Sequence, residues 1–297
     1  MNHIKIPHTG RDLYIPADLS ECDERQYIEM SALILEYQCG HIDYETLRIH
    51  AVYKLLDMKQ GKATINDNDK FSNIYQLSLL IDSFFETDDN GNKVIKQYYI
   101  NNPVASFKGA IIDYYGPSDE FNNVTFGEYI DGLGYFIDFR DTGEIKYLHL
   151  LLATFYRIKK QDIALSKLLD TFDGDVRVKY NAASVASRAK DFEKQHIGIV
   201  YGFYLLFASM QKYITTAILI IEGKEIDLTV LFDDSTPSKQ KESDLPGIGM
   251  KAIMYSFAES GVYGDIERVR NIPLWEALVH MYHLTKKSKD FDANQPK

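Results

Sequence analysis

One stretch of the sequence restricts the possible folds more than any other. Residues 197–221 read IGIVYGFYLLFASMQKYITTAILII, and this run is long enough to cross a bilayer, because about 20 apolar residues span the hydrocarbon core. Gln211 and Lys212 lie near its centre, however, and a lysine there costs about 2.5 to 3.5 kcal/mol on insertion scales. We therefore expect a buried helix of a multi-helix bundle, with a membrane-attached scaffold as the alternative.

Most of the remaining sequence carries helical periodicity. Ser20 and Asp23 have the spacing of a capping box, and apolar residues continue at helical spacing up to Gly40. A second helix is expected to begin near Asp43 and to end before Gly61. Further helices are predicted near residues 71–85, from Thr125 to 137, and near 145–160, 163–172, 181–195, 250–260 and 273–287.

Three segments interrupt this pattern. In residues 86–100, Asn90-Gly91 predicts the tight turn of a small β-hairpin. Residues 101–123 show neither a helical nor a strand period, so irregular or extended chain is expected there. Residues 233–249 are polar and contain two prolines and two glycines, as a linker or mobile loop does. The prediction is a mainly α fold, an irregular multi-helix bundle with a small β-hairpin, organised as a helical core domain (1–232), a linker or loop (233–249) and a C-terminal helical module (250–297).

Charge and cysteine content narrow the possible partners and the compartment. Lys and Arg number 33 against 43 Asp and Glu, so the net charge of -10 repels phosphate backbones and argues against nucleic-acid binding. The densest basic runs, residues 157–160 and 286–289, lie at predicted helix ends, where cations offset the helix dipole. Cys22 and Cys39 lie near the two ends of one predicted helix, too far apart to bridge. Together with an N-terminus that lacks the apolar core of a secretory signal, this favours a reduced, cytoplasmic setting.

Catalytic and metal-binding patterns are weak. With Gly91 at the sixth position of an EF-hand loop, the neutral Gln97 occupies the position of the closing carboxylate, so a hairpin turn is the better interpretation. His280 and His283 have i, i+3 spacing on one predicted helix, but only basic and polar residues follow where a third zinc ligand is needed. Nucleophile and phosphate-loop motifs are absent from the sequence. We therefore predict no enzymatic activity, no cofactor, and no catalytic, cofactor-binding or metal-binding residues.

The 21 tyrosines are more informative than the histidines. Tyr98, Tyr99, Tyr114 and Tyr115 lie in irregular segments, where they either cover the core from outside or form a protein interface, because tyrosine is enriched at such surfaces. Tyr114 and Tyr115 are expected to end an extended run before a turn at Gly116-Pro117, and if this segment has a function beyond folding, we expect it to be an exposed turn that contacts a protein partner. Just downstream, Thr125 and Glu128 have the spacing of a capping box, followed by the helical apolar stripe Phe126, Tyr129, Ile130, Leu133 and Ile137.

Four segments resemble a family found in the tail-gene modules of tailed bacteriophages and prophages. They read LYIPADLSECDERQYIEMSALI, DYYGPSDEFNNVTFGEYI, YLHLLLATFYRIKK and SGVYGDIERVRNIPLWEALVHM, and the resemblance is weakest in residues 162–244. It implies a non-enzymatic role as a tail-assembly chaperone or adaptor. Many tail chaperones are shorter than this chain, so a virion structural part of the tail or connector stays an alternative, as does a metal-dependent enzyme whose site is scattered in the sequence.

The resemblance also implies the partners and the location. The expected partners are phage structural proteins of the tape-measure or tail-tube type, and a homo-oligomer is a further option. Neither nucleic acid nor a membrane is expected as a partner. The expected location is the cytoplasm of the bacterial host, with the virion as the second option.

Overall fold

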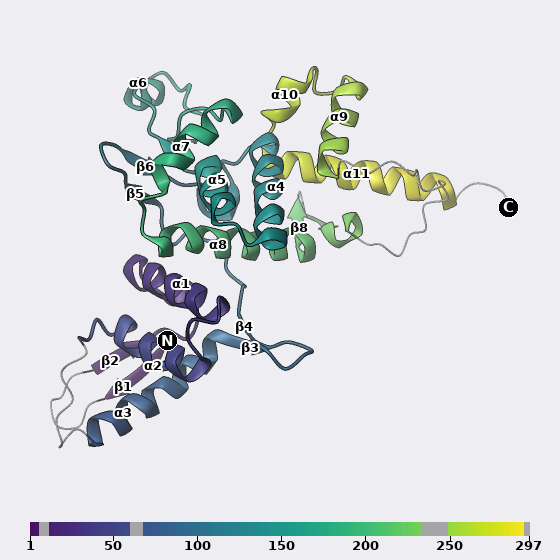
Figure 1. Cartoon of the computed structure of the whole chain (residues 1–297). Coiled ribbons are helices and arrows are strands. Elements are labelled where there is room, and N and C mark those ends of the chain that lie inside the picture. The colour runs from purple at the N-terminus through teal and green to yellow at the C-terminus, as the bar shows by residue number, and fades with distance from the viewer. Residues whose placement is uncertain (6–11, 60–67, 222, 233–248, 294–297) are drawn as a thin grey trace. The chain divides into compact units, whose positions relative to one another are not determined.

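The computed structural model of the chain describes residues 1–5, 12–59, 68–221, 223–232 and 249–293. These residues form eleven α-helices, five short 3-10 helices and nine short strands, and the strands pair only into sheets of two or three. The predicted mainly α fold with a small β-hairpin is therefore confirmed. The chain divides into two compact units, Met1–Val104 with Lys194–Ser209, and Ala105–Glu193 with Met210–Lys297 (Figure 1).

The first unit contains three complete helices and two β-hairpins. Its helix α1 begins three residues later than the sequence indicates. Asp23 and Gln26 form the capping box, rather than Ser20 and Asp23. The amide of Ser20 instead donates to Asp18 in a preceding 3-10 turn. The elements are β1 (Asn2–Lys5), β2 (Asp12–Ile15), α1 (Glu24–Gln38), α2 (Tyr44–Leu55), α3 (Asn68–Ser78), β3 (Phe85–Thr87) and β4 (Lys93–Ile95).

The hairpin of β3 and β4 turns at the predicted Asn90-Gly91, although of these two only Gly91 has a positive φ. Gly91 adopts a φ of 84°, in the left-handed region that glycine enters without steric cost. Phe85 pairs with Ile95, so the paired strands are shorter than the predicted segment 86–100. The predicted start of the second helix is also confirmed, since the Asp43 side chain caps α2 by accepting from the amide of Thr46.

Helix α8 (Ile197–Thr216) completes the first unit by crossing α1 at two glycines. A Cβ on Gly198 would lie 2.0 Å from the carbonyl oxygen of Ile28, and one on Gly202 would lie 2.9 Å from the Tyr27 ring. The Tyr27 hydroxyl donates to the carbonyl of Gly202 at 2.7 Å. Only residues without a side chain permit this approach, so the two glycines fix where the helices cross.

The apolar run that contains α8 is shorter as a helix than predicted. Residues Ile218–Ile221 leave the helix and form strand β8, which pairs with β9 (Lys224–Asp227), because β-branched isoleucines favour extended backbone. By length and composition, Ile197–Thr216 is the one described helix that could cross a membrane, and 67% of its apolar window is buried inside the structure. A buried core helix has the same composition, so this is weak evidence for a membrane span.

The second unit contains a three-stranded antiparallel sheet and most of the helices. The sheet fits the extended alternative expected for residues 101–123, which include two of its strands. Its order is β5-β6-β7. The elements are β5 (Ser106–Lys108), β6 (Asp113–Tyr115), α4 (Phe126–Thr142), α5 (Ile145–Phe155), β7 (Arg157–Ile158), α6 (Ile163–Leu168), α7 (Val185–Phe192), the end of α8, β8, β9, α9 (Met250–Ser260), α10 (Ile266–Arg270) and α11 (Leu274–Ala293).

The tyrosine pair ends strand β6, as the predicted extended run does, but Tyr114 is buried, so the expectation of an exposed turn is wrong for this residue. Tyr114 pairs with Phe107 on one side and Ile158 on the other, and only 5% of it is exposed. Its ring packs edge-on against Phe192 with centroids 4.7 Å apart. The alternative that such tyrosines cover the core fits Tyr114 better than the alternative of a protein interface.

The predicted capping box at the start of α4 is confirmed: the Thr125 hydroxyl accepts from the amide of Glu128, and the Glu128 carboxylate accepts from the amide of Thr125. The C-terminal helices lie against this end of α4, where the amide of Phe126 donates to the carbonyl of Ile272 at 2.9 Å. Residues 233–248 of the predicted linker lie outside the described residues. Whether residues 250–297 form a module that folds alone stays a prediction.

Candidate functional site

The histidine pair considered as a zinc site packs among aromatic rings. The ring of His280 lies edge-on to Phe257 and to Tyr263, with centroids 4.8 and 5.2 Å away. Burial, and to a smaller extent His283, lowers the pKa of His280, which favours the neutral ring. Among the described residues, no group of three or more His, Cys, Asp or Glu side chains is placed to hold a metal ion.

In the acidic turn at residues 88–92, considered as a calcium loop, backbone amides of the turn bind the Asp88 carboxylate. The Asp88 carboxylate accepts from the amides of Asn90 and Asn92 at 3.0 and 2.7 Å. Hydrogen bonds from the side chain and amide of Asn92 lower the pKa of Asp88. Its oxygens therefore stabilise the hairpin turn, as interpreted from the sequence.

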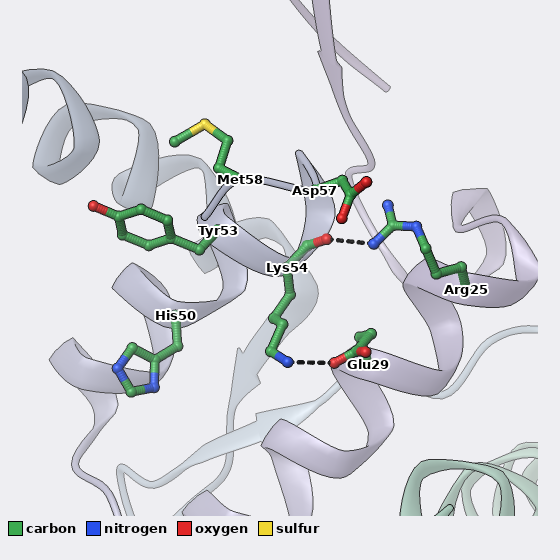
Figure 2. A pocket seen from close by; sticks show the side chains of 7 residues that line it. All are labelled: Arg25, Glu29, His50, Tyr53, Lys54, Asp57 and Met58. Carbon is green, nitrogen blue, oxygen red and sulfur yellow. Dashed lines mark hydrogen bonds and ion pairs between the residues drawn. The ribbon is translucent and has the colours of Figure 1, made fainter. Parts of the chain in front are cut away.

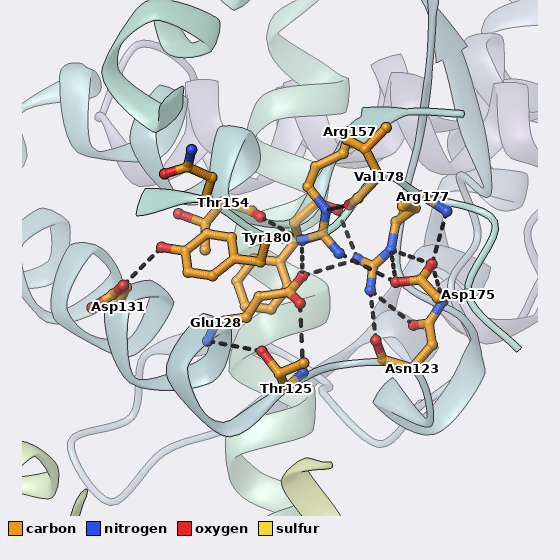
Figure 3. Close-up of polar contacts among 12 residues, drawn as sticks. Asn123, Thr125, Glu128, Asp131, Thr154, Arg157, Asp175, Arg177, Val178 and Tyr180 are labelled. Atoms are coloured by element: carbon orange, nitrogen blue, oxygen red, sulfur yellow. Dashed lines mark hydrogen bonds and ion pairs between the residues drawn. The ribbon is translucent and has the colours of Figure 1, made fainter. Parts of the chain in front are cut away.

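Instead, the structure gathers buried charges at the start of α4, in a cluster that the sequence did not reveal (Figure 3). Arg157 and Arg177 both donate to the same Glu128 oxygen, Oε1, from Nη1 atoms 2.6 and 3.0 Å away. Glu128 and Arg177 are fully buried, and Arg157 is 2% exposed. Their charges therefore have almost no contact with water and depend on one another.

A second carboxylate balances the charge. Asp175 accepts from Arg177 Nε at 2.9 Å and from Arg157 Nη2 at 3.3 Å, so two carboxylates face two guanidinium groups. Burial by itself would lower the pKa of Arg177, but Glu128 and Asp175 raise it above its ordinary value. We call Glu128, Arg157, Asp175 and Arg177 the ion cluster.

The remaining N–H groups of the two arginines bind main-chain carbonyls. These carbonyls come from the loop before α4, from the end of α5 and from the chain after Arg177, so the ion cluster joins three separate segments. The bonds are Arg177 Nη2 to Asn123 O (2.8 Å), Arg177 Nη1 to Phe155 O (2.8 Å), Arg157 Nη1 to Thr154 O (3.1 Å) and Arg157 Nε to Val178 O (2.8 Å).

This geometry suits a structural role better than a catalytic one. A general base needs a lone pair directed at a substrate, whereas the Glu128 carboxylate is enclosed by two guanidinium groups and the Thr125 amide. A buried ion pair holds its geometry because separating the charges leaves one of them unsolvated. The ion cluster therefore fixes the positions of the three segments.

The backbone just before the cluster is strained. Glu120 and Phe121 have φ values of 56° and 55°, in the left-handed region that residues with side chains seldom occupy. The strain is held in place because Phe121 is buried and the Trp275 indole N–H donates to the carbonyl of Glu120 at 2.8 Å. Packing by α11 therefore accounts for this conformation.

Two grooves in the described part of the chain carry charges that neutralise one another. Beside α1 and α2, a groove of about 460 Å³ has Lys54 paired with Glu29 at 2.6 Å, while Arg25 donates to the Lys54 carbonyl at 2.7 Å (Figure 2). In the second unit, a groove of about 750 Å³ has Asp131 bound to Arg270 at 2.5 Å. Neither groove presents a nucleophile next to a base. The first groove is also lined by His50, Tyr53, Asp57 and Met58.

The thiol of Cys22, in the first unit, is not reactive. Burial raises the pKa of the Cys22 thiol to about 12, so it stays protonated at neutral pH and is a poor nucleophile. Both Cys22 and Cys39 are free thiols. The expectation that they do not bridge one another is confirmed.

Comparisons of the chain with models of protein families, with curated proteins and with solved structures give no match. Function must therefore be inferred from the residues, their contacts and the resemblance of the four segments.

Proposed function

We propose that this chain is a non-enzymatic tail-module protein of a tailed bacteriophage or prophage. It acts in the host cytoplasm as a tail-assembly chaperone or adaptor that binds other phage structural proteins of the tape-measure or tail-tube type. The resemblance of four segments supports the class of protein, and the surface of α3 supports the mode of action.

The observation that carries this proposal is an exposed apolar stripe in the first unit. Phe71, Tyr75 and Leu79 follow one another at four-residue spacing. They therefore lie on one side of α3 and of the 3-10 helix Leu79–Phe84 that continues it, and all three are exposed. Ile74 and Ser78, on the adjoining side of the helix, are buried. The helix therefore packs along that side and leaves the exposed apolar stripe available to a partner.

The chemistry of the buried groups favours binding over catalysis. The ion cluster encloses its carboxylates, the His280 ring packs among aromatic rings, and the Cys22 thiol is protonated. Protein binding needs none of these groups to react, since a few central side chains, often aromatic, supply most of the binding energy of an interface.

Binding to purified candidate partners tests the proposal. The full chain is titrated by calorimetry into a tape-measure protein and into a tail-tube protein from the same tail-gene module. We expect at least one to bind, and a Phe71→Ser/Tyr75→Ser variant to bind at least about tenfold more weakly, as is common at interface aromatic residues. Tyr98→Ser, at another exposed tyrosine, is the matched control. If neither protein binds, the proposed function is wrong.

The content of finished particles separates the two roles within this proposal. A chaperone leaves the assembly, whereas a structural part of the tail or connector stays in it. Mass spectrometry of purified virions therefore assigns the chain to assembly if it is absent, and to the virion if it is present in fixed proportion to the tail proteins.

A further inference from the structure

The segment between Ile158 and Val178 leaves the fold and returns to it at one firmly held base. The amide of Lys160 donates to the carbonyl of Val176, and the amide of Val178 donates to the carbonyl of Ile158, both at 2.9 Å. The ion cluster lies directly beside these bonds, because Arg157 and Arg177 flank the segment. Both ends of the segment are therefore held in place by bonds that do not involve its middle.

The middle of the segment carries α6, a short helix without a buried residue (Figure 1). Leu165, Leu168 and Leu169 are 56, 81 and 60% exposed. Their i, i+3, i+4 spacing places them on one side of the helix, which is the spacing of side chains that enter an apolar groove on a partner. The helix is already formed, with the amide of Ser166 donating to the carbonyl of Asp162 at 2.9 Å, so binding loses less conformational entropy.

The charges around the three leucines indicate which charges should surround the apolar groove on the partner. The exposed Asp162 and Asp170 lie at the two ends of α6, directly flanking the apolar side. Lys160 is offset by its ion pair with Asp173 at 2.7 Å, whereas Lys167 keeps its charge in the middle of α6, over the Phe172 ring at 5.1 Å. Negative charge therefore marks the two ends of α6.

The geometry points to α6 as a docking helix whose three leucines enter an apolar groove on a partner protein, with lysine or arginine on the groove's rim facing Asp162 and Asp170. This inference rests on the proposed function, in which the chain binds other proteins. A lipid surface fits poorly, because anionic headgroups repel the two aspartates. A second copy of the chain also fits poorly, because the two grooves described above are lined mainly by polar and charged side chains.

Calorimetry with the tape-measure and tail-tube proteins tests the leucines. We expect Leu165→Ala/Leu168→Ala/Leu169→Ala to bind at least about 30-fold more weakly than the unchanged chain, as truncation of central interface residues does. Leucine and alanine are both good helix formers, so α6 itself is retained. Val262→Ala, at an equally exposed apolar residue in the same unit, is the matched control and should bind normally. Equal binding by the triple variant overturns the docking helix and leaves the proposed function intact.

The same titrations test the rim. Asp162→Asn/Asp170→Asn should weaken binding several-fold and flatten its dependence on salt, because two screened charge pairs are removed. Asp162 makes no side-chain cap bond, and asparagine tolerates the left-handed backbone of Asp170, so the helix stays folded. An unchanged salt dependence would contradict the basic rim.

A cross-link decides the case in which neither tail protein binds, so that the proposed function has failed. A photoreactive residue replaces Leu168 in cells that make the chain, and Val262 in the control. The docking helix stands if Leu168 yields an adduct with an identified protein whose linked residue lies in an apolar groove rimmed by Lys or Arg, and if the triple variant binds that purified protein at least about 30-fold more weakly. No adduct above the Val262 control, or undiminished binding, overturns it.

Discussion

Residues 157–178 have two ends that are held by the ion cluster, which we call the base, and a middle that carries α6, which we call the tip. The two parts reverse the usual distribution of side chains. At the base, charged side chains are buried in the ion cluster, whereas at the tip the leucines of α6 face solvent. The buried charges are tolerated because they neutralise one another and because main-chain carbonyls bind the remaining N–H groups. The exposed leucines contribute little to folding. One segment thus separates the residues that hold the fold from those available for binding.

Removing a charge from the base should have the largest effect. Arg177→Ala leaves Glu128 and Asp175 with one guanidinium group between them, and breaking a buried pair in this way costs about 3 to 5 kcal/mol of unfolding free energy. Arg140→Ala, which removes an exposed arginine paired with Asp141, should cost less than about 1 kcal/mol. Urea unfolding, followed by amide exchange in α4 and α5, measures both. Similar losses for the two variants would mean that the ion cluster does not stabilise the base.

Loss of the cap on α4 should have a smaller effect. Thr125→Ala removes the hydroxyl that accepts from the amide of Glu128, and losing an N-cap costs about 1 kcal/mol. Thr142→Ala, at the other end of the same helix and exposed, is the control. Urea unfolding should show a loss for Thr125→Ala that clearly exceeds that of the control, and a reversed order would contradict the role of the cap.

The ion pair of Lys160 and Asp173, at the edge of the base, should make the free energy of unfolding only weakly dependent on pH. Partial burial would raise the pKa of Asp173, but hydrogen bonds from Lys160 and from the amide of Asp175 lower it overall. Because the folded pKa lies below the unfolded one, this contribution is present above about pH 4 and is lost as the pH falls through the folded pKa. In unfolding measured against pH, Asp173→Asn should reduce the acid loss by at most a few tenths of a kcal/mol, as expected for an exposed pair. A larger change would show that Asp173 supports the ion cluster itself.

Changes at the tip should also have little effect on stability. The Leu165→Ala/Leu168→Ala/Leu169→Ala variant should unfold within about 0.5 kcal/mol of the unchanged chain, because exposed side chains lose few contacts. Leu152→Ala, at a fully buried leucine of α5, should lose about 2 to 5 kcal/mol in the same assay. A loss of that size at the tip would mean that the leucines belong to the core after all.

The sequence predicted those features that depend on neighbouring residues. Asp43 and Thr125 marked helix starts because a cap acts within three residues, and Asn90-Gly91 marked a turn for the same reason. Residues 218–221 were wrongly extended from α8, because an apolar run does not by itself distinguish a helix from a strand.

The ion cluster could not be predicted in this way. Arg157 was interpreted as a cation at a helix end, and it does bind the Thr154 carbonyl in the last turn of α5. Its pairing with Glu128 joins residues separated by 29 positions, and the pair of Glu128 with Arg177 spans 49. Local periodicity contains no information about such contacts. The leucines of α6 fell within a predicted helix, but their exposure depends on the tertiary structure.

The glycine crossing of α8 over α1 has a consequence for synthesis on the ribosome. Residues 24–38 leave the ribosome early, yet the segment that covers Tyr27 and Ile28 comes at Gly198 and Gly202. At about 5 to 20 residues per second, translation of residues 105–193 takes on the order of ten seconds, during which the first unit lacks one of its helices. A nascent chain stalled before Lys194 should therefore expose α1 to protease, and one stalled well beyond Ser209 should protect it.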